Sequence, residues 1–307
     1  MPRAKIIVVG SANVDLYIQT ERLPGPGETV LGGGFQMSPG GKGANQAVAA
    51  ARAGSQVYFI GNVGDDQFGR NTINNLAKDG VAIDYVSLDR HEPTGIAMII
   101  IEKGGQNMIA VAAGANMTLS TSQVEKARED VRDAGFVLLQ LEIPVPVVEC
   151  AVNMAWREGV PVMLNAAPAR EGALTKEIIS KLDTLIVNEF EAQLYSGVKV
   201  DNDVDADKAA RALQAMGAKR VVVTMGSKGA LAVAKDAVYV PARRVEAVDT
   251  VGAGDAFCGA LVTALAEGED FASAAKFASA AAALACTKVG AQSSLPERVD
   301  IESFARE

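Results

Sequence analysis

The feature that most constrains the fold of this 307-residue chain is the alternation of short apolar runs with helical patterns. The apolar runs are continuous and too short for helices, as expected of strands buried on both faces of a sheet: 6–9, 57–60, 137–141, 162–164, 185–187 and 221–223. Helical spacing occupies segments between several of these runs: 44–53, 122–132, 146–158 and 205–216. This alternation predicts a mostly parallel central sheet with helices on both faces, a three-layer α/β/α sandwich.

Two stretches break this pattern and predict a second, smaller sheet. Apolar and polar residues alternate in 14–18 and 29–35 around the turn LPGPGE, and 95–111 holds two apolar runs joined by EKGGQN. We expect a small antiparallel sheet, inserted at about 14–37 and 95–112, that serves as a lid, a dimerisation surface or both; an ordinary edge hairpin is the alternative. No linker or repeat divides the chain, so residues 1–307 are expected to form a single domain, with two helices in 252–288 separated at Gly268.

Composition excludes several classes of function. A single histidine, His91, rules out multi-histidine zinc sites and any Ser-His-Asp triad that does not use it. The net charge of −8, with no basic stripe, is not typical of a nucleic-acid-binding protein. Three widely spaced cysteines in apolar surroundings are expected to be reduced thiols of a cytoplasmic protein. No apolar run suits a signal peptide or the roughly 18 residues of a membrane span, so no membrane association is expected.

The segment VDTVGAGDAFCGA, residues 248–260, is the sharpest chemical feature. A short extended stretch meets Gly252 and Gly254 and enters an apolar helix at once. The unpaired amides of a helix N-terminus bind anions, and glycines let a phosphate approach the backbone. Asp255 lies in the first turn, where the helix dipole is expected to keep it ionised and therefore weakly basic. A dipole-stabilising role alone would explain Asp255 but not the two glycines.

The familiar nucleotide motifs do not fit. The dinucleotide fingerprint G-x-G-x-x-G fails because Phe257 stands where the third glycine belongs. The Walker loop fails around Lys42, because Gln36 replaces its first glycine and Gly43 its hydroxyl residue. A nicotinamide-dependent oxidoreductase, the first competitor suggested by the strand–helix alternation, is correspondingly disfavoured.

Polar residues follow the ends of two predicted strands and a second glycine-rich helix entry. Asn13 and Asp15 come just after the first strand, two residues apart and therefore on one side of an extended chain. The stretch PGGKGANQAVAA brings Gly41, Lys42 and Asn45 to the start of a helix, and Glu142 ends another strand. Because ligands of open α/β sheets bind at the carboxyl ends of strands, this grouping suits a hydroxyl-rich ligand. A plain glycine-rich helix entry is the alternative.

Two further segments suit a nucleotide and its metal. Asn188 and Glu191 are three residues apart after a strand, and such an amide and carboxylate can hold a hydrated magnesium ion. A helix-capping asparagine with a surface glutamate is the other interpretation of this pair. TMGSKG, residues 224–229, opens a strand end into a glycine turn that either wraps a nucleotide or forms a plain hairpin.

GGKGANQAVAA and DTVGAGDAFCGA resemble the two signatures of the PfkB family of carbohydrate and nucleoside kinases, and the similarity extends from IIVVGSANVD to VGAQSSLP. The resemblance implies an α/β sandwich with a small lid sheet that forms a homodimer interface, and phosphorylation of D-ribose at its 5-hydroxyl by ATP. It implies that Asp255 is the catalytic base and that the amides of Gly252, Ala253 and Gly254 form the anion hole.

The resemblance also implies three sets of binding residues. The sugar-binding positions are Asn13, Asp15, Gly41, Lys42, Asn45, Glu142 and Asp255. The nucleotide-binding positions are Asn188, Thr224, Gly226, Ser227, Gly229, Gly254 and Ser279. The metal positions are Asn188 and Glu191 for Mg²⁺, and Asp249, Val251, Ala285, Lys288, Gly290 and Ser294 for an activating K⁺. Ser279 is shorter than the Asn or His that the family often has there, which affects nucleotide preference.

Two alternatives to ribose phosphorylation follow from the same residues. The first is a kinase for 2-deoxyribose or another small sugar, although Asn13 and Asp15 favour a sugar with its full set of hydroxyls. The second is a non-catalytic sugar- or nucleotide-binding regulator, which should have lost catalytic positions. Asp255, Lys42 and Glu191 are all present.

Overall fold

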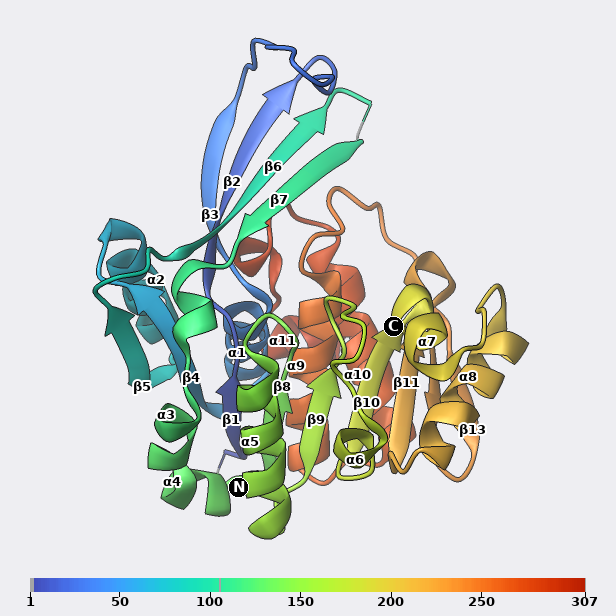
Figure 1. The fold of residues 1–307 in the computed structure, drawn as a ribbon. Helices are drawn as coiled ribbons and strands as arrows, with labels where there is room; N and C mark the ends of the chain where they lie inside the picture. Colours follow the sequence, from blue (N-terminus) through green and yellow to red (C-terminus); the bar gives the residue numbers. More distant parts are fainter. Residues whose placement is uncertain (1–2, 105, 307) are drawn as a thin grey trace.

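The structure is a computed structural model that describes residues 3–104 and 106–306. Its centre is a nine-stranded sheet in the order β13-β12-β11-β10-β9-β8-β1-β4-β5 (Figure 1). The strands are β1 (Lys5–Val9), β4 (Gln56–Gly64), β5 (Ala82–Asp89), β8 (Phe136–Leu139), β9 (Val162–Asn165), β10 (Thr184–Asn188), β11 (Arg220–Thr224), β12 (Ala230–Val233) and β13 (Ala237–Val240). All neighbours pair in parallel except β12 with β11 and with β13.

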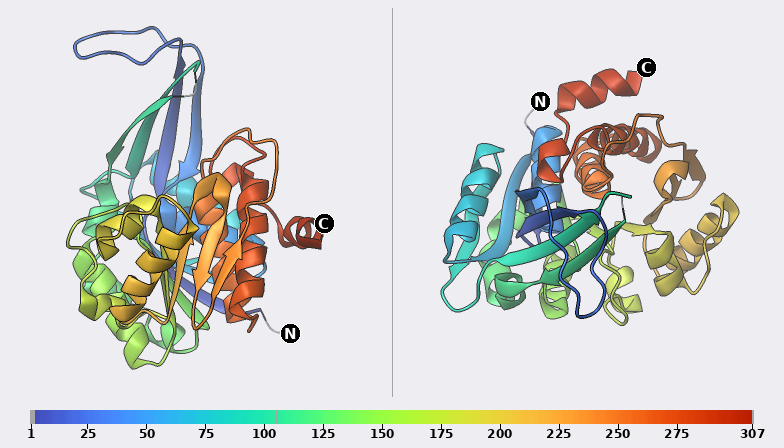
Figure 2. Two further views of the ribbon diagram at one scale, coloured as in Figure 1. Left: turned by 90° about the vertical axis from the view of Figure 1, so that its right-hand side faces the viewer. Right: turned by 90° about the horizontal axis from the view of Figure 1, so that it is seen from above.

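Helices cover both faces of this sheet, as the strand–helix alternation predicts (Figures 1 and 2). One face packs against α3 (Thr121–Lys126), α4 (Arg128–Arg132), α5 (Val145–Arg157), α6 (Lys176–Ile179), α7 (Glu189–Ser196) and α8 (Asp203–Ala215). The other packs against α1 (Lys42–Arg52), α2 (Gln67–Lys78), α9 (Ala253–Ala266), α10 (Phe271–Ala285) and α11 (Arg298–Arg306). Successive β1 residues alternate between the two cores, Ile7 and Val9 in one and Ile6 and Val8 in the other. The three-layer α/β/α sandwich is confirmed.

The second sheet is also confirmed and projects away from the sandwich (Figure 1). Its order is β3 (Phe35–Gly40), β2 (Asn13–Thr20), β6 (Gly95–Glu102) and β7 (Asn107–Ala112). The pairs β2–β3 and β6–β7 are antiparallel, whereas β2 and β6, which join them, pair in parallel. We call this four-stranded sheet the lid sheet.

One predicted lid strand is wrong. Residues 29–34 carry no strand, and the partner of β2 begins only at Phe35. The reason is the run Gly32-Gly33-Gly34, because glycine has no side chain to pack on a sheet and loses the most backbone entropy in a strand. In the predicted turn EKGGQN, Gly105 lies outside the described residues.

Other departures from the sequence-based expectation are local. The predicted helix over 122–132 is two short helices that meet at Ala127, the first of them begun by a capping box at Ser120. The elements α2, β5 and α11 were not predicted. Met1 and Pro2, at the start of the segment considered for a signal peptide, lie outside the described residues. Within the described ranges, no helix is both long and apolar enough to cross a membrane.

Candidate active site

The N-terminus of α9 lies where the two glycines of the GAGD segment place it. Gly252 caps the helix with φ of 81°, a left-handed conformation that side chains other than glycine rarely adopt. Gly254 is different, because its backbone is helical and an added Cβ would meet no described atom within 4 Å. Neither conformation nor packing inside the described chain requires glycine at Gly254. This leaves open space beside the backbone amides at the helix start.

Asp255, in the first turn of α9, has both carboxylate oxygens held by amide groups from α1. Asn45 Nδ2 donates to Oδ2 at 2.9 Å, and Gln46 Nε2 donates to Oδ1 at 2.9 Å. The structure therefore brings together Asp255 and Asn45, which the sequence assigned to two separate motifs. Gln46 was missed, and its only sequence signal is its place beside Asn45 in the same turn.

Burial raises the pKa of the Asp255 carboxyl, and the Lys42 ammonium and the Gln46 and Asn45 amides oppose that rise. The net pKa stays above the ordinary aspartate value because the side chain is only 8% exposed. The expectation of a weakly basic carboxylate set by the helix dipole is wrong. Burial raises the pKa of Asp255 overall, which makes it a stronger base than an ordinary aspartate.

A second group of charged side chains lies beside Asp255. Burial and the neighbouring Glu142 carboxylate raise the pKa of Asp15 to about 6, and the Asp255 carboxylate adds to the rise. Glu142 Oε2 accepts hydrogen bonds from the Lys42 backbone N–H at 3.0 Å and from the Ser11 hydroxyl. Burial would lower the pKa of Lys42, but the surrounding carboxylates raise it overall, so this lysine stays charged. Ser11 was missed by sequence reasoning.

Gly41, the remaining predicted sugar-site position on this side, is the N-cap of α1, and its neighbour Gly40 leaves room for the Asp15 carboxylate. The predicted residues Asp15, Gly41, Lys42, Asn45 and Glu142 are therefore brought to one place around Asp255.

Asn13 is oriented by a residue that the sequence did not reveal. Asn116, in the short 3₁₀ helix η1 (Gly114–Thr118), donates from Nδ2 to Asn13 Oδ1 at 2.7 Å. Its Oδ1 accepts the backbone N–H of Ala12 at 2.8 Å. Because the Asn13 oxygen is already bonded, its NH₂ group is the part left to donate to a ligand. The only sequence signal was an asparagine after a Gly-Ala pair, as at Asn45.

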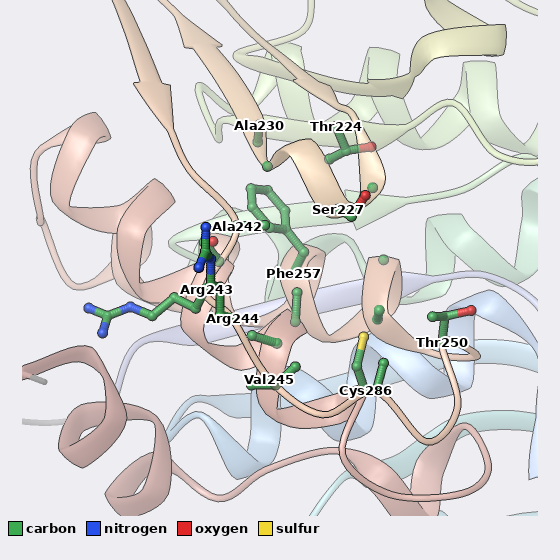
Figure 3. A pocket seen from close by; sticks show the side chains of 18 residues that line it. Thr224, Ser227, Ala230, Ala242, Arg243, Arg244, Val245, Thr250, Phe257 and Cys286 are labelled. Atoms are coloured by element: carbon green, nitrogen blue, oxygen red, sulfur yellow. The ribbon is translucent and has the colours of Figure 1, made fainter.

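A cavity of about 630 Å³ lies on the other side of the α9 N-terminus. Thr224 and Ser227, at the β11–β12 connection, lie across it from Val245 and Cys286 (Figure 3). Six predicted nucleotide-site residues line it: Thr224, Gly226, Ser227, Gly229, Gly254 and Ser279. Asn188 is not among the lining residues. Sequence reasoning missed other lining residues, including Arg244, Val245 and Phe257.

The β11–β12 segment forms the hairpin that its sequence suggests, and it also lines the cavity. It is an antiparallel hairpin whose connection contains the 3₁₀ helix η2 (Gly226–Lys228), and the same connection lines the cavity.

Asn188 and Glu191 form a reciprocal capping box at the start of α7. Asn188 Oδ1 accepts the Glu191 N–H at 2.8 Å, and Glu191 Oε2 accepts the Asn188 N–H at 2.9 Å. Asn188 is thus a helix cap, as the alternative interpretation held, but Glu191 is only 3% exposed instead of being a surface residue. Its Oε1 accepts no hydrogen bond from the described residues, and burial raises its pKa.

The side-chain oxygens of Asn188 and Glu191 fit a magnesium ion that keeps most of its waters. The described residues contain no cluster of three or more His, Cys, Asp or Glu suited to a metal. Mg²⁺ commonly takes only one or two carboxylates, with phosphate oxygens and water completing the octahedron. One oxygen of the buried Glu191, near Lys42, matches that requirement.

The predicted potassium ligands fall in two adjoining segments, 249–251 and 285–294. Asp249 joins them, since Oδ1 accepts the Val251 N–H at 3.0 Å and Oδ2 accepts the Gly290 N–H at 2.9 Å. The Lys288 ammonium group is itself positively charged, so only the backbone carbonyl of this residue is suited to bind a cation. The Asp249 carboxylate and the backbone carbonyls of the two segments are oxygen ligands of the kind that a hard cation takes, so these residues fit K⁺ by their chemistry. Ala285 and Ser294 lie at the two ends of the second segment.

The sequence matches the pfkB family of carbohydrate kinases over residues 3–298, and the chain belongs to this family. It is therefore an enzyme that transfers a phosphoryl group to an alcohol group of its acceptor.

Individual members of the family are similar over almost the whole chain. A ribokinase from Haemophilus influenzae is 40% identical over 303 residues, 98% of each chain. A deoxyribokinase from Salmonella typhi is 41% identical over 301 residues, 97% of each chain. The solved structure of Arabidopsis thaliana ribokinase complexed with ribose and ATP superposes with a TM-score of 0.92 at 34% identity, covering 100% of both chains.

Proposed function

We propose that this enzyme phosphorylates D-ribose at the 5-hydroxyl with ATP, giving D-ribose 5-phosphate and ADP. The observation that carries the proposal is the position of Asp255. It lies buried at the start of a helix, between a cavity lined by Ala253 and Gly254 and a group of amides and carboxylates suited to a polyol. Similarity to a ribokinase with ribose and ATP bound supports the same assignment.

In the proposed reaction, Asp255 accepts the proton of the 5-hydroxyl as its oxygen forms a bond to the γ-phosphorus and the bond to the β-phosphate oxygen breaks. The amides of Gly252, Ala253 and Gly254 hold the oxygens of the transferring group, whose charge must be stabilised without rearrangement. A carboxylate with a raised pKa suits this role, because a base is most effective when its pKa approaches the working pH.

The other roles are proposed by position. Sugar hydroxyls bind Asn13, Asp15, Gly41, Lys42, Asn45 and Glu142, and ATP binds Asn188, Thr224, Gly226, Ser227, Gly229, Gly254 and Ser279. Mg²⁺, held through Asn188 and Glu191, would neutralise phosphate charge. K⁺ would bind Asp249, Val251, Ala285, Lys288, Gly290 and Ser294. We further propose a cytoplasmic enzyme of one domain, 1–307, that forms a homodimer through the lid sheet.

The test of the catalytic assignment is Asp255→Asn in a coupled assay of ADP release. This change keeps the shape of the side chain and removes the base, and general-base catalysis contributes roughly 10²- to 10⁴-fold. We expect ribose-dependent kcat to fall by at least about 100-fold, while ATP binding measured by calorimetry changes little. Turnover close to that of the wild type would refute the role of Asp255.

A kinase of 2-deoxyribose is the second candidate, favoured by the similarity to Salmonella deoxyribokinase. The amide and carboxylate groups of Asn13 and Asp15 would be left without partners by a sugar that lacks a hydroxyl. We therefore expect kcat/KM for ribose to exceed that for 2-deoxyribose by about tenfold or more. Equal values, or a preference for 2-deoxyribose, would replace the ribose assignment and leave the kinase mechanism intact.

A further inference from the structure

Behind the Asp255 carboxylate lies a buried chain of side-chain amides. Gln46 Nε2 donates to Asp255 Oδ1 at 2.9 Å and to Asn165 Oδ1 at 3.1 Å. Gln140, at the end of β8, donates from Nε2 to Gln46 Oε1 at 2.7 Å. Both glutamines are fully buried. The chain therefore runs from the central sheet through α1 to the first turn of α9.

These partners allow only one orientation of the Gln46 amide. If the amide turned over, its oxygen would face the oxygens of Asp255 and Asn165, and its NH₂ group would face the NH₂ of Gln140. All three hydrogen bonds would be replaced by repulsive contacts between like groups, and two of them lie in a fully buried site. With the Gln140 and Asn165 amides oriented as the structure has them, Gln46 presents its NH₂ group to Asp255.

Gln140 is itself fixed tightly. Its Oε1 occupies the space that a Cβ at Gly10 would need, and this oxygen has no hydrogen-bond partner among the described residues. A buried oxygen without a donor is unfavourable. The arrangement therefore gives up some stability while keeping the Gln140 NH₂ directed at Gln46.

The groups facing Asp255 come from several elements. They are the Lys42 ammonium on α1, the carboxylates of Asp15 on β2 and Glu142 after β8, and the Cys258 thiol on α9 itself. Burial and the Glu142 charge raise the pKa of Asp255, and the hydrogen bond from Gln46 lowers it. Only Gln46 and Asn45 contact the carboxylate as side-chain donors among the described residues.

We propose that Gln46 is a positioning residue for the phosphoryl-transfer reaction, which aims the Asp255 carboxylate and keeps it ionised at neutral pH, and that Gln140 and Asn165 set its orientation. This inference rests on the proposed base role of Asp255. It adds that the base is controlled through a relay of residues outside the proposed sugar and nucleotide positions.

The test is the pH profile of kcat/KM in Gln46→Met, which keeps the length of the side chain and removes its amide. Losing a donor to the ionised form raises the pKa of a carboxyl, so the acidic limb should move upward by about one pH unit. On the acidic side of the limb the rate should fall about tenfold below that of the wild type, and it should recover largely at high pH. Gln140→Met should shift the limb in the same direction by less, because it removes the orienting contact and not the donor.

Thr263→Val is the matched control. Thr263 is fully buried between the same two helices, where it bonds Ser55 and the Ala50 carbonyl, and it does not contact Asp255. We expect it to lose some thermal stability and to keep the wild-type pH profile. Unfolding midpoints of all variants separate loss of folding from loss of orientation.

The possible outcomes are distinct. An acidic limb in Gln46→Met that coincides with that of the wild type overturns the inference. A uniform loss of rate at every pH also overturns it, because a merely structural role would act in that way. If Asp255→Asn retains turnover, the proposed function fails instead. If Asp255→Asn is inactive at every pH while Gln46→Met recovers at high pH, both are supported.

Discussion

Asp15 shows that this site is built at the expense of local stability. Its carboxyl lies at the inner end of β2, with 8% of the residue exposed, beside the carboxylates of Glu142 and Asp255. Burial and those charges raise its pKa from 3.8 to about 6. A group whose pKa is raised by folding is protonated more readily in the folded state, so its ionisation opposes folding.

Because the ionised Asp15 carboxylate opposes folding, Asp15→Asn is expected to stabilise the protein at neutral pH. The free energy of unfolding of the wild type should fall between about pH 4 and pH 6, because the Asp15 carboxyl loses its proton at a lower pH in the unfolded state than in the folded state. Above about pH 6 the loss of stability should stay constant. The variant lacks this fall, so at pH 8 it should be more stable by up to about 3 kcal/mol, with little difference below pH 4. Urea unfolding across this range measures the difference, and the exposed Asp84→Asn is the control. A variant less stable than the wild type at pH 8 would contradict the prediction.

Individual site residues were predictable when a local pattern carried them. Asp255, Lys42 and Asn45 stand in glycine-rich helix entries whose chemistry can be inferred from neighbouring residues. Gln46 and Asn116 were not predictable, because their roles depend on partners 209 and 103 positions away. His91 lies in an exposed turn after β5, where its backbone N–H donates to Asp89, and it contributes no side chain to the cavity.

At the scale of elements, edge strands and mostly polar helices could be predicted less well than the central strands. β5 is an edge strand whose side chains are partly buried or exposed, so it has no continuous apolar run. α2 is amphipathic, but it is mostly polar and buries only one large apolar side chain, that of Leu76. The central strands were predicted because both of their faces are buried. The strand predicted over 29–35 does not form, because three consecutive residues of that segment are glycines with no side chains to pack on a sheet.

Asp249 links two loops next to the N-terminus of α9, which gives a prediction about monovalent cations. In Asp249→Ala, the amides of Val251 and Gly290 lose their common acceptor, and the proposed K⁺ site loses its carboxylate. We expect the ratio of activity in KCl to activity in choline chloride to fall toward one. Glu246→Ala, an exposed change in the same loop, should keep the wild-type ratio. Full cation activation in Asp249→Ala would remove Asp249 from the proposed site.

At the scale of the whole molecule, the lid sheet presents an apolar face that nothing in the described chain covers. Leu16 pairs with Met37 on one side and Met98 on the other, so these side chains share a face. Phe35 and Met108 lie in the next row of the same face, and four of these five side chains are about half exposed. An exposed apolar surface of this kind marks an interaction site.

We expect the apolar face of the lid sheet to join two copies of the chain. Met98→Glu would place a charge in the middle of that face and should convert a dimer into a monomer, as measured by light scattering. Gln36→Glu adds a charge on the same sheet, beside Tyr17 on the opposite face, and should leave the dimer intact. A monomeric wild type, or a Met98→Glu variant that remains dimeric, would reject this surface as the interface.

The hydrogen bond between Asn45 and Asp255 joins residues 210 positions apart. During synthesis, the ribosome releases the glycine-rich entry of α1 long before the GAGD segment exists. The proposed sugar-binding residues of α1 are therefore synthesised well before Asp255, the proposed base, and the helix pair α1–α9 forms only after most of the chain has emerged. Non-local contacts of this kind form slowly, because the intervening chain must first be ordered. Assembly of the proposed site is thus a late event in folding, and a chain that ends before Asp255 is expected to be inactive.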